Sequence, residues 1–134
     1  MMMNSKSFEE IIDRFRKIMF SEEFDIIVAI ANGGIIPAAI LNQRLTIQME
    51  LLKINLRDSE HKTKYNSPKL LEPIHFEFKN KRILLVDDRV KSGQTLKFAS
   101  DLLQDAKIIK TFAVNGKADY SLYDEDCFMF PWRL

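Results

Sequence analysis

Residues 84–96 read LLVDDRVKSGQTL, an apolar run that ends in two adjacent carboxylates, Asp87 and Asp88. A short polar loop follows, and the chain then reads as a helix from Gln94 or Thr95. A buried strand that passes through a polar loop into a helix is typical of a sheet with parallel strands. Ligands in such sheets bind beyond the carboxyl ends of the strands, which is where this loop falls.

Strands and helices alternate on both sides of this stretch. Ser7 and Glu10 have the spacing of a capping box. Helical spacing of apolar residues predicts helices over 8–20, 35–45 and 95–104. β-Branched or alternating apolar residues predict strands over 25–31, 48–57, 74–78, 82–88, 107–114 and 127–130. This order predicts an α/β protein with a mainly parallel, twisted sheet and helices on both faces.

The composition indicates one soluble domain over 1–134. The chain has 134 residues, of which 46% are hydrophobic and 29% charged, as in ordinary globular proteins. A net charge of +1 argues against a nucleic-acid surface built on bulk positive charge. The longest apolar stretch, 26–41, is broken by Asn, Gly and Pro, so we expect no membrane association. A single cysteine, Cys127, fits a reducing cytoplasm.

Residues 58–72 read DSEHKTKYNSPKLLE, which is polar and has no clear period. Connections of this length in a compact domain are usually functional or mobile. We therefore expect 58–72 to be a flexible loop.

The loop behind the paired carboxylates has the chemistry of an anion site. A turn that opens a helix gathers free backbone N–H groups at the positive end of the helix dipole, which suits a phosphate. Gly93 allows a close approach of the backbone, and the hydroxyls of Ser92 and Thr95 can donate as well. Asp87 and Asp88 suit sugar hydroxyls or a divalent cation instead. Together these groups predict a site for a ribose phosphate.

Two other interpretations of the pair exist. Adjacent aspartates after a strand can be solvated turn residues, and Ser-Gly is common turn chemistry. Receiver domains of signalling systems also carry paired aspartates, but there the pair ends the first strand. Here the pair lies deep in the chain with a phosphate-type loop behind it, which favours the ribose-phosphate interpretation.

The stretch resembles the phosphoribosyl pyrophosphate signature of type I phosphoribosyltransferases. That signature is an apolar strand, two acids, x-x-x-[ST]-G-x-T and a helix. IIVAIANGGIIPAAIL (26–41) is similar to the family's strand, pyrophosphate loop and following helix, and 58–72 falls where the family has its flexible hood. ADYSLYDEDCFMFPW (118–132) resembles the ending of small bacterial and archaeal 6-oxopurine enzymes of the xanthine–guanine type.

The resemblance implies transfer of the phosphoribosyl group of phosphoribosyl pyrophosphate to a nucleobase, purine-like, with release of pyrophosphate. It implies Mg²⁺ as cofactor, with Asp87 and Asp88 as the carboxylates near the metal and the ribose. Family members are commonly dimers or tetramers, and the sequence does not decide between a monomer, a homodimer and a homotetramer. The implied contacts are Asp87, Asp88, Lys91, Ser92, Gly93, Gln94 and Thr95 to the ribose phosphate, Asn32 and Gly33 to pyrophosphate, and Lys117, Phe128 and Met129 to the base.

Four residues depart from the family pattern, one of which is Arg133 in place of the acid that often follows the final F-P-W. Lys91 replaces an aspartate proposed as a general acid/base near the purine, and we expect it to face solvent. Asn32 replaces a common cation before Gly-Gly. Cys127 replaces an aromatic residue beside the base, and we expect it to be a small core residue. Two functions therefore stay open: a phosphoribosyltransferase with an altered base preference, or a non-catalytic sensor or regulatory subunit that binds a ribose phosphate or nucleotide.

Overall fold

The computed structural model describes residues 4–55 and 67–134 and contains a six-stranded sheet. The strand order is β4-β3-β2-β5-β6-β7. Every neighbouring pair is parallel except β3 with β4, which confirms the predicted mainly parallel sheet. The strands are β2 (Ile26–Ala31), β3 (Gln48–Asn55), β4 (Lys69–Leu70), β5 (Arg82–Arg89), β6 (Ile108–Asn115) and β7 (Tyr120–Tyr123).

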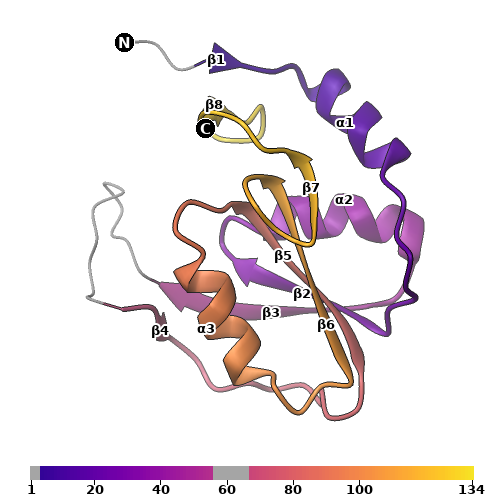
Figure 1. Ribbon diagram of the computed structural model, residues 1–134, viewed down its shortest axis with the longest axis vertical. Coiled ribbons are helices and arrows are strands. Elements are labelled where there is room, and N and C mark those ends of the chain that lie inside the picture. The colour runs from indigo at the N-terminus through magenta and orange to yellow at the C-terminus, as the bar shows by residue number, and fades with distance from the viewer. Residues whose placement is uncertain (1–3, 56–66) are drawn as a thin grey trace.

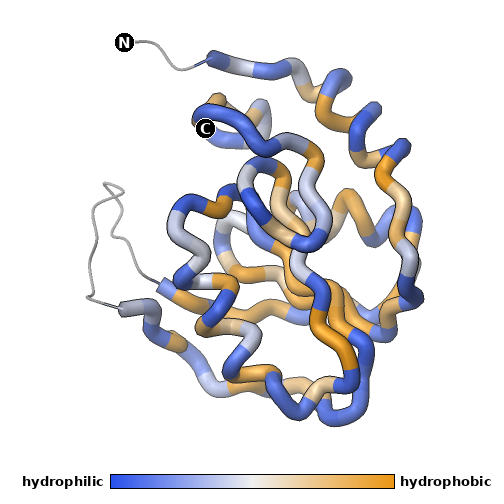
Figure 2. The backbone as a smooth tube through the Cα atoms, viewed as in Figure 1, coloured by the Kyte–Doolittle hydropathy of each residue, from blue (hydrophilic) through white to orange (hydrophobic). Residues whose placement is uncertain are grey.

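Helices cover both faces of this sheet (Figure 1). Side chains of α1 (Phe8–Lys17) and α2 (Ile35–Leu45) pack in one apolar cluster with β2, β5 and β6. Side chains of α3 (Gln94–Leu102) pack in a second cluster on the other face. Figure 2 shows hydrophobic residues concentrated along the central strands, as expected for a sheet buried on both sides.

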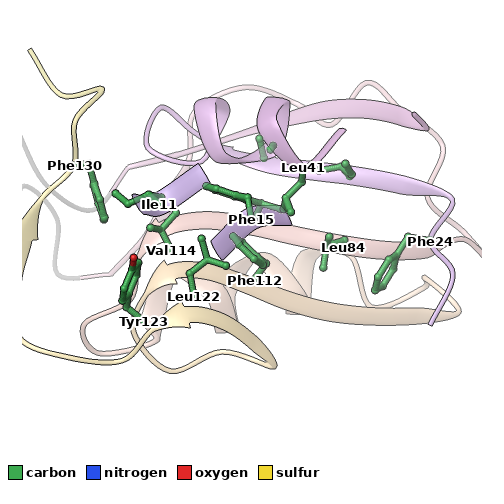
Figure 3. Packing of buried hydrophobic residues seen from close by; sticks show 14 of the residues in the cluster. Ile11, Phe15, Phe24, Leu41, Leu84, Phe112, Val114, Leu122, Tyr123 and Phe130 are labelled. Carbon is green, nitrogen blue, oxygen red and sulfur yellow. The ribbon is translucent and has the colours of Figure 1, made fainter. Parts of the chain in front are cut away.

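Aromatic packing anchors α1 to the sheet. The ring of Phe15 stacks on that of Phe112 in β6, with centroids 5.8 Å apart. Ile11 lies one turn away on the same helix face and is also buried (Figure 3). The Ser7 side chain accepts a hydrogen bond from the Glu10 amide at 3.0 Å, so the predicted capping residue does start the helix.

A second, two-stranded sheet joins segments that are far apart in the sequence. β1 (Asn4–Ser5) pairs in parallel with β8 (Phe128–Met129). Lys6, just after β1, lies over the Phe128 ring, with its ammonium 5.0 Å from the ring centroid, and forms an ion pair with Glu125 at 2.9 Å. Figure 1 shows this pair of strands at the top of the molecule, near the C-terminus. Parallel pairing and the Lys6 contacts therefore hold residues 128–129 in place.

Several predicted elements differ from the structure. Residues 74–78 form no strand, although Phe76 and Phe78 are half-buried and His75 and Glu77 exposed, as the alternation predicted. The first helix ends at Lys17 rather than at residue 20, because the backbone turns extended at Ile18 (ψ 136°). The third helix ends at Leu102 rather than at residue 104.

The sequence pattern gave no prediction of β1, β4 or β7. Of the predicted loop 58–72, residues 58–66 lie outside the described part of the chain. Its last residues include β4, which pairs with Ile54 and Asn55 at the end of β3. Within the described ranges, no helix has the length and apolar character that crossing a membrane requires.

Candidate functional site

The loop between β5 and α3 presents the start of a helix to solvent. Gly93 adopts φ +83°, a left-handed conformation that glycine takes without steric cost, and it directly precedes the helix. The Lys97 amide donates to the Gly93 carbonyl at 3.0 Å, which is the first hydrogen bond of the helix ladder. The amides of Thr95 and Leu96, ahead of Lys97, therefore have no partner in that ladder and can donate to a ligand. Ser92 Oγ accepts from the Gln94 amide at 3.3 Å and shapes the turn.

This loop lines one wall of a cavity of about 620 Å³, a size typical of small-molecule sites. The end of β5, the loop and the first turn of α3 form one side, and residues at the C-terminal end of the chain form the other. The lining residues are Asp87, Asp88, Arg89, Val90, Lys91, Ser92, Gly93, Thr95, Leu96, Met129, Phe130, Arg133 and Leu134. The turn is therefore open to a ligand, as an anion site requires.

The two carboxylates line the cavity at the end of β5. Asp87 Oδ1 accepts the Asp88 amide at 2.8 Å, and Asp88 Oδ1 accepts the Arg89 amide at 2.7 Å. Burial raises the pKa of Asp87 well above its ordinary value, and the neighbouring charge of Asp88 raises it further. A group that brings positive charge or hydroxyl donors to this pair would relieve the repulsion.

The Asn32-Gly33-Gly34 corner after β2 contacts the same carboxylate. A Cβ atom on Gly33 would lie 2.6 Å from Asp88 Oδ1, so the corner packs directly against that side chain. A Cβ atom on Gly34 would overlap the carbonyl oxygen of Val86 in β5. The peptide bond between Ala31 and Asn32 is cis. The corner after β2 and the end of β5 are thus in contact through Asp88.

Met129, Phe130, Arg133 and Leu134 form the opposite wall, and Phe128 lies behind it. Phe128 is 1% exposed and packs edge-on against Tyr123 and Phe130. Its carbonyl oxygen accepts a hydrogen bond from Arg89 Nη2 at 2.5 Å. Met129 is 52% exposed and lines the cavity. A ligand in the cavity would therefore meet Met129, whereas the Phe128 side chain belongs to the core.

Two further cations reach the cavity. The Arg89 guanidinium lies over the Phe130 ring, 4.6 Å from its centroid. Arg133 Nη1 lies 3.6 Å from Asp88 Oδ2. Both arginines line the cavity together with Lys91, so three cationic side chains face two carboxylates there. Such a surface favours a ligand that carries negative charge.

The structure brings together most of the predicted site residues. The cavity lining includes Asp87, Asp88, Lys91, Ser92, Gly93, Thr95 and Met129. Asn32 and Gly33 lie outside the lining, but Gly33 contacts Asp88. Gln94, Lys117 and Phe128 do not line the cavity.

Physical reasons account for these positions. The Phe128 side chain is fully packed in the core, and Lys117 is exposed in the loop after β6. Gln94 is exposed at the first position of α3. Lys91 is exposed, as expected. Cys127 is exposed as well, so the prediction that it lies in the core was wrong. The segment before β8 stays at the surface, and its first buried side chain is that of Phe128.

Arg89, Phe130 and Arg133 were not among the predicted site residues. Arg89 directly follows the two acids, and its charge at the end of an apolar strand was the available signal. Phe130 and Arg133 become part of the site only through the pairing of β1 with β8. No local sequence pattern predicts that pairing.

Comparison with known proteins places the chain in a family. Residues 3–130 match the family described as "Phosphoribosyl transferase domain", and the chain belongs to this family. The xanthine-guanine phosphoribosyltransferase of Idiomarina loihiensis is 26% identical over 125 residues, which cover 89% of this chain and 77% of that protein.

Solved structures share the fold. The purine phosphoribosyltransferase from Pyrococcus horikoshii has a TM-score of 0.81 and 24% identity, with 97% of this chain and 93% of that chain covered. A Neisseria gonorrhoeae protein solved with bound ppGpp has a TM-score of 0.76 and 21% identity, with 100% and 92% covered. The α/β architecture is therefore that of type I phosphoribosyltransferases, close to the 6-oxopurine enzymes, as the sequence motifs indicated.

Proposed function

We propose that the chain transfers the phosphoribosyl group of phosphoribosyl pyrophosphate to a purine base and releases pyrophosphate. The observation that carries this proposal is the cavity itself. It joins the amide-rich turn before α3, the Asp87–Asp88 pair and the Met129 wall in one space. Family membership and the likeness to a xanthine-guanine enzyme support the same reaction.

Each part of the cavity has a role in this proposal. The backbone amides and hydroxyls of residues 91–95 hold the 5′-phosphate at the positive end of α3. Asp87 and Asp88 hold the ribose hydroxyls. The Asn32–Gly33 corner, which touches Asp88, contacts the pyrophosphate group. The base lies against Met129, at the opposite wall.

The residues present fit a Mg²⁺ ion bound together with substrate. Mg²⁺ typically takes one or two protein carboxylates and completes its shell with substrate phosphates and water. Asp87 and Asp88 supply two such carboxylates, and a bound cation would offset the burial and the neighbouring charge that raise the pKa of Asp87. The described residues contain no group of three or more metal-binding side chains, so substrate oxygens must complete the shell. When bound, Mg²⁺ supplies charge stabilisation for the leaving pyrophosphate.

The chain's own groups position the reaction. A base nitrogen forms a bond to the anomeric carbon of the ribose while the bond to pyrophosphate breaks, the electron pair of that bond leaves with pyrophosphate, and the ring N–H proton of the purine passes to water. Amides at the start of α3 fix the phosphate, and the carboxylates fix the sugar, so the anomeric carbon is held near the base wall. A charged lysine has no lone pair that could accept a proton. Lys91 therefore cannot act as the general base, the role that an aspartate at this position would have.

A second candidate function is nucleotide binding without turnover, as in a sensor or regulatory subunit. Lys91 and Asn32 remove groups that the reaction uses in the family, and Arg133 pairs with a carboxylate that ribose needs. A structural relative holds ppGpp. The transferase remains the better supported function because base-side residues vary with substrate in this family.

Pyrophosphate release decides between these functions. The protein is incubated with phosphoribosyl pyrophosphate, Mg²⁺ and one of hypoxanthine, guanine, xanthine, adenine, orotate or uracil. The transferase predicts release with a purine. Tight binding of phosphoribosyl pyrophosphate, measured by calorimetry, without release for any base would favour the sensor.

Substitution of Lys91 tests whether the loss of the family's aspartate at this position limits the reaction. Lys91→Asp should raise activity with a 6-oxopurine about 10- to 100-fold, because a carboxylate can take the base proton. Lys97→Asp, on the exposed surface of α3, is the matched control and should leave activity unchanged. No gain in a folded Lys91→Asp variant would show that other residues limit the reaction.

A further inference from the structure

Asn115, the last residue of β6, has a polar side chain that is almost completely buried. The residue is 2% exposed, which is rare for an asparagine. It does not line the cavity, so it does not touch a ligand there. What Asn115 contributes to the site therefore follows from the residues that it holds.

The side chain of Asn115 binds the backbone of the segment that leads into β8. Nδ2 donates to the carbonyl of Glu125 at 3.1 Å and to that of Asp126 at 3.4 Å. Oδ1 accepts a hydrogen bond from the Glu125 amide at 3.0 Å. Because all three partners are backbone groups, these bonds fix the path of the chain itself. That path continues into the base wall of the cavity, which consists of Met129, Phe130, Arg133 and Leu134.

The backbone of the same residue holds the other wall. Asn115 lies opposite Arg89 in the pairing of β5 with β6, and its carbonyl accepts the Val90 amide at 2.9 Å. Gly116 packs beside it, since a Cβ atom on Gly116 would overlap the carbonyl oxygen of Val90. Val90 belongs to the phosphate wall of the cavity, the lining residues from Asp87 to Leu96. Asn115 is thus hydrogen-bonded both to the phosphate wall and to the segment that carries the base wall.

We propose that Asn115 is a positioning residue for the transferase reaction, which sets the separation of the phosphate wall and the base wall without touching substrate. A nucleotide spans both walls, so its affinity depends on their separation. Ribose 5-phosphate needs the phosphate wall alone. Turnover depends on the same separation, because the anomeric carbon is held by one wall and the base by the other. This inference rests on the proposed function.

Two ligands that differ by the base separate the walls. Affinities for guanosine 5′-monophosphate and for ribose 5-phosphate are measured by calorimetry. Asn115→Ala should weaken binding of the nucleotide about tenfold or more, because the base wall is no longer fixed. Binding of ribose 5-phosphate should stay within about twofold of the wild type. In turnover, the KM for the purine should rise, and the KM for phosphoribosyl pyrophosphate should not.

Asn42→Ala is the matched control. Asn42 Nδ2 donates to the Ile47 carbonyl at 3.0 Å, and Oδ1 accepts the Ile47 amide at 2.9 Å, so Asn42 also holds a backbone segment by both ends of its amide. It lies on α2 and does not line the cavity. The variant should keep the wild-type ratio of the two affinities.

A second pair of variants tests the same bond from its exposed side, whether or not Asn115→Ala folds. Glu125→Pro removes the amide that donates to Asn115, whereas Glu125→Ala keeps it. Both variants remove the ion pair of Glu125 with Lys6, so the comparison isolates the hydrogen bond. Glu125→Pro should lose affinity for the nucleotide alone, and Glu125→Ala should keep it.

The outcomes separate this inference from the proposed function. A wild-type affinity ratio in folded Asn115→Ala, or in Glu125→Pro, would overturn the role of Asn115 and leave the transferase standing. An equal loss in Asn42→Ala would assign the effect to general stability, and an equal loss in Glu125→Ala would assign it to the Lys6 ion pair; either result would overturn the role. Failure of the wild type to bind both ligands would overturn the proposed function itself.

Discussion

At the end of β5, the carboxylate of Asp87 lies beside that of Asp88 and is raised in pKa by burial and by the second charge. In the ligand-free protein this pair lowers stability once both groups are charged. The same repulsion makes the pair receptive to hydroxyl donors or a divalent cation. The pair of carboxylates that suits such a ligand thus also lowers the stability of the ligand-free fold.

The pH dependence of folding should report this weakness. Because the pKa of Asp87 in the folded protein lies above the ordinary 3.8, the folded state holds the proton more tightly than the unfolded chain. Its contribution to stability is complete below that value and is lost as the pH rises toward the folded pKa. Relative to Asp87→Asn, the wild type should lose about 1.4 kcal/mol for each pKa unit of the shift.

Urea denaturation of both proteins at a series of pH values gives this difference in the free energy of unfolding. Asp101→Asn, which removes an exposed carboxylate near Lys97, is the control and should show no such trend. A difference between wild type and Asp87→Asn that stays flat from acid to neutral pH would contradict the assignment.

Phe128 and Met129 are neighbours with opposite expected roles. Phe128→Ala should cost about 3–5 kcal/mol of stability, because its ring is buried in the core. Met129→Ala should change stability little and weaken binding of a purine nucleotide, because Met129 is half exposed in the cavity wall. Thermal denaturation and calorimetry of both variants test this. A stable Phe128→Ala variant that binds no nucleotide would restore the base contact predicted from sequence.

Helices and strands could be predicted from the sequence where the spacing of the apolar side chains matches the hydrogen bonding of the backbone. The helix Ile35–Leu45 has the predicted bounds because Gly34 and Thr46 break the pattern at both ends. Residues 74–78 alternate between half-buried and exposed side chains but pair with no strand. Alternation reports which side chains are buried, and it does not reveal whether a backbone partner exists.

The site could be predicted only in part for a related reason. The loop after β5 carries its chemistry in consecutive residues, so Asp87 to Thr95 are readable locally. The opposite wall exists because β8 is held by β1, a pairing of two residues on each side. Such a short, non-local contact leaves no pattern in the sequence, and Phe130 and Arg133 were missed as site residues with it.

The two glycines after β2 should respond differently to the same change. Gly34→Ala places a methyl group onto a backbone carbonyl of β5 and should destabilise the fold by about 1–3 kcal/mol or more. Gly33→Ala places one against the Asp88 side chain, which can move, so the fold should persist while the affinity for phosphoribosyl pyrophosphate falls. Thermal denaturation and calorimetry distinguish them. Equal loss of stability in both variants would contradict this contact.

At the scale of the whole molecule, the cavity lies where the carboxyl ends of parallel strands meet the C-terminal segment. A ligand there contacts β5, the start of α3 and residues near β8 at once, so its binding energy is distributed over the fold. Ligand binding to the native state alone raises the stability of the entire molecule.

Phosphoribosyl pyrophosphate with Mg²⁺, at a hundredfold excess over its dissociation constant, should stabilise the protein by about 2.7 kcal/mol. For a domain of this size that corresponds to a rise in Tm of roughly 5–12 °C. The double variant Asp87→Asn, Asp88→Asn should fold but show no such rise, because both ribose and metal contacts are lost. A shift equal to that of the wild type would remove these residues from the site.

The pairing of β1 with β8 has a consequence for biosynthesis. The turn before α3 leaves the ribosome well before residues 128–129, so the two walls of the cavity are made at different times. Asn4 and Ser5 must wait as an unpaired segment until the final strand emerges. A translational pause or truncation before Phe128 therefore leaves a chain that has the turn before α3 but lacks the opposite cavity wall.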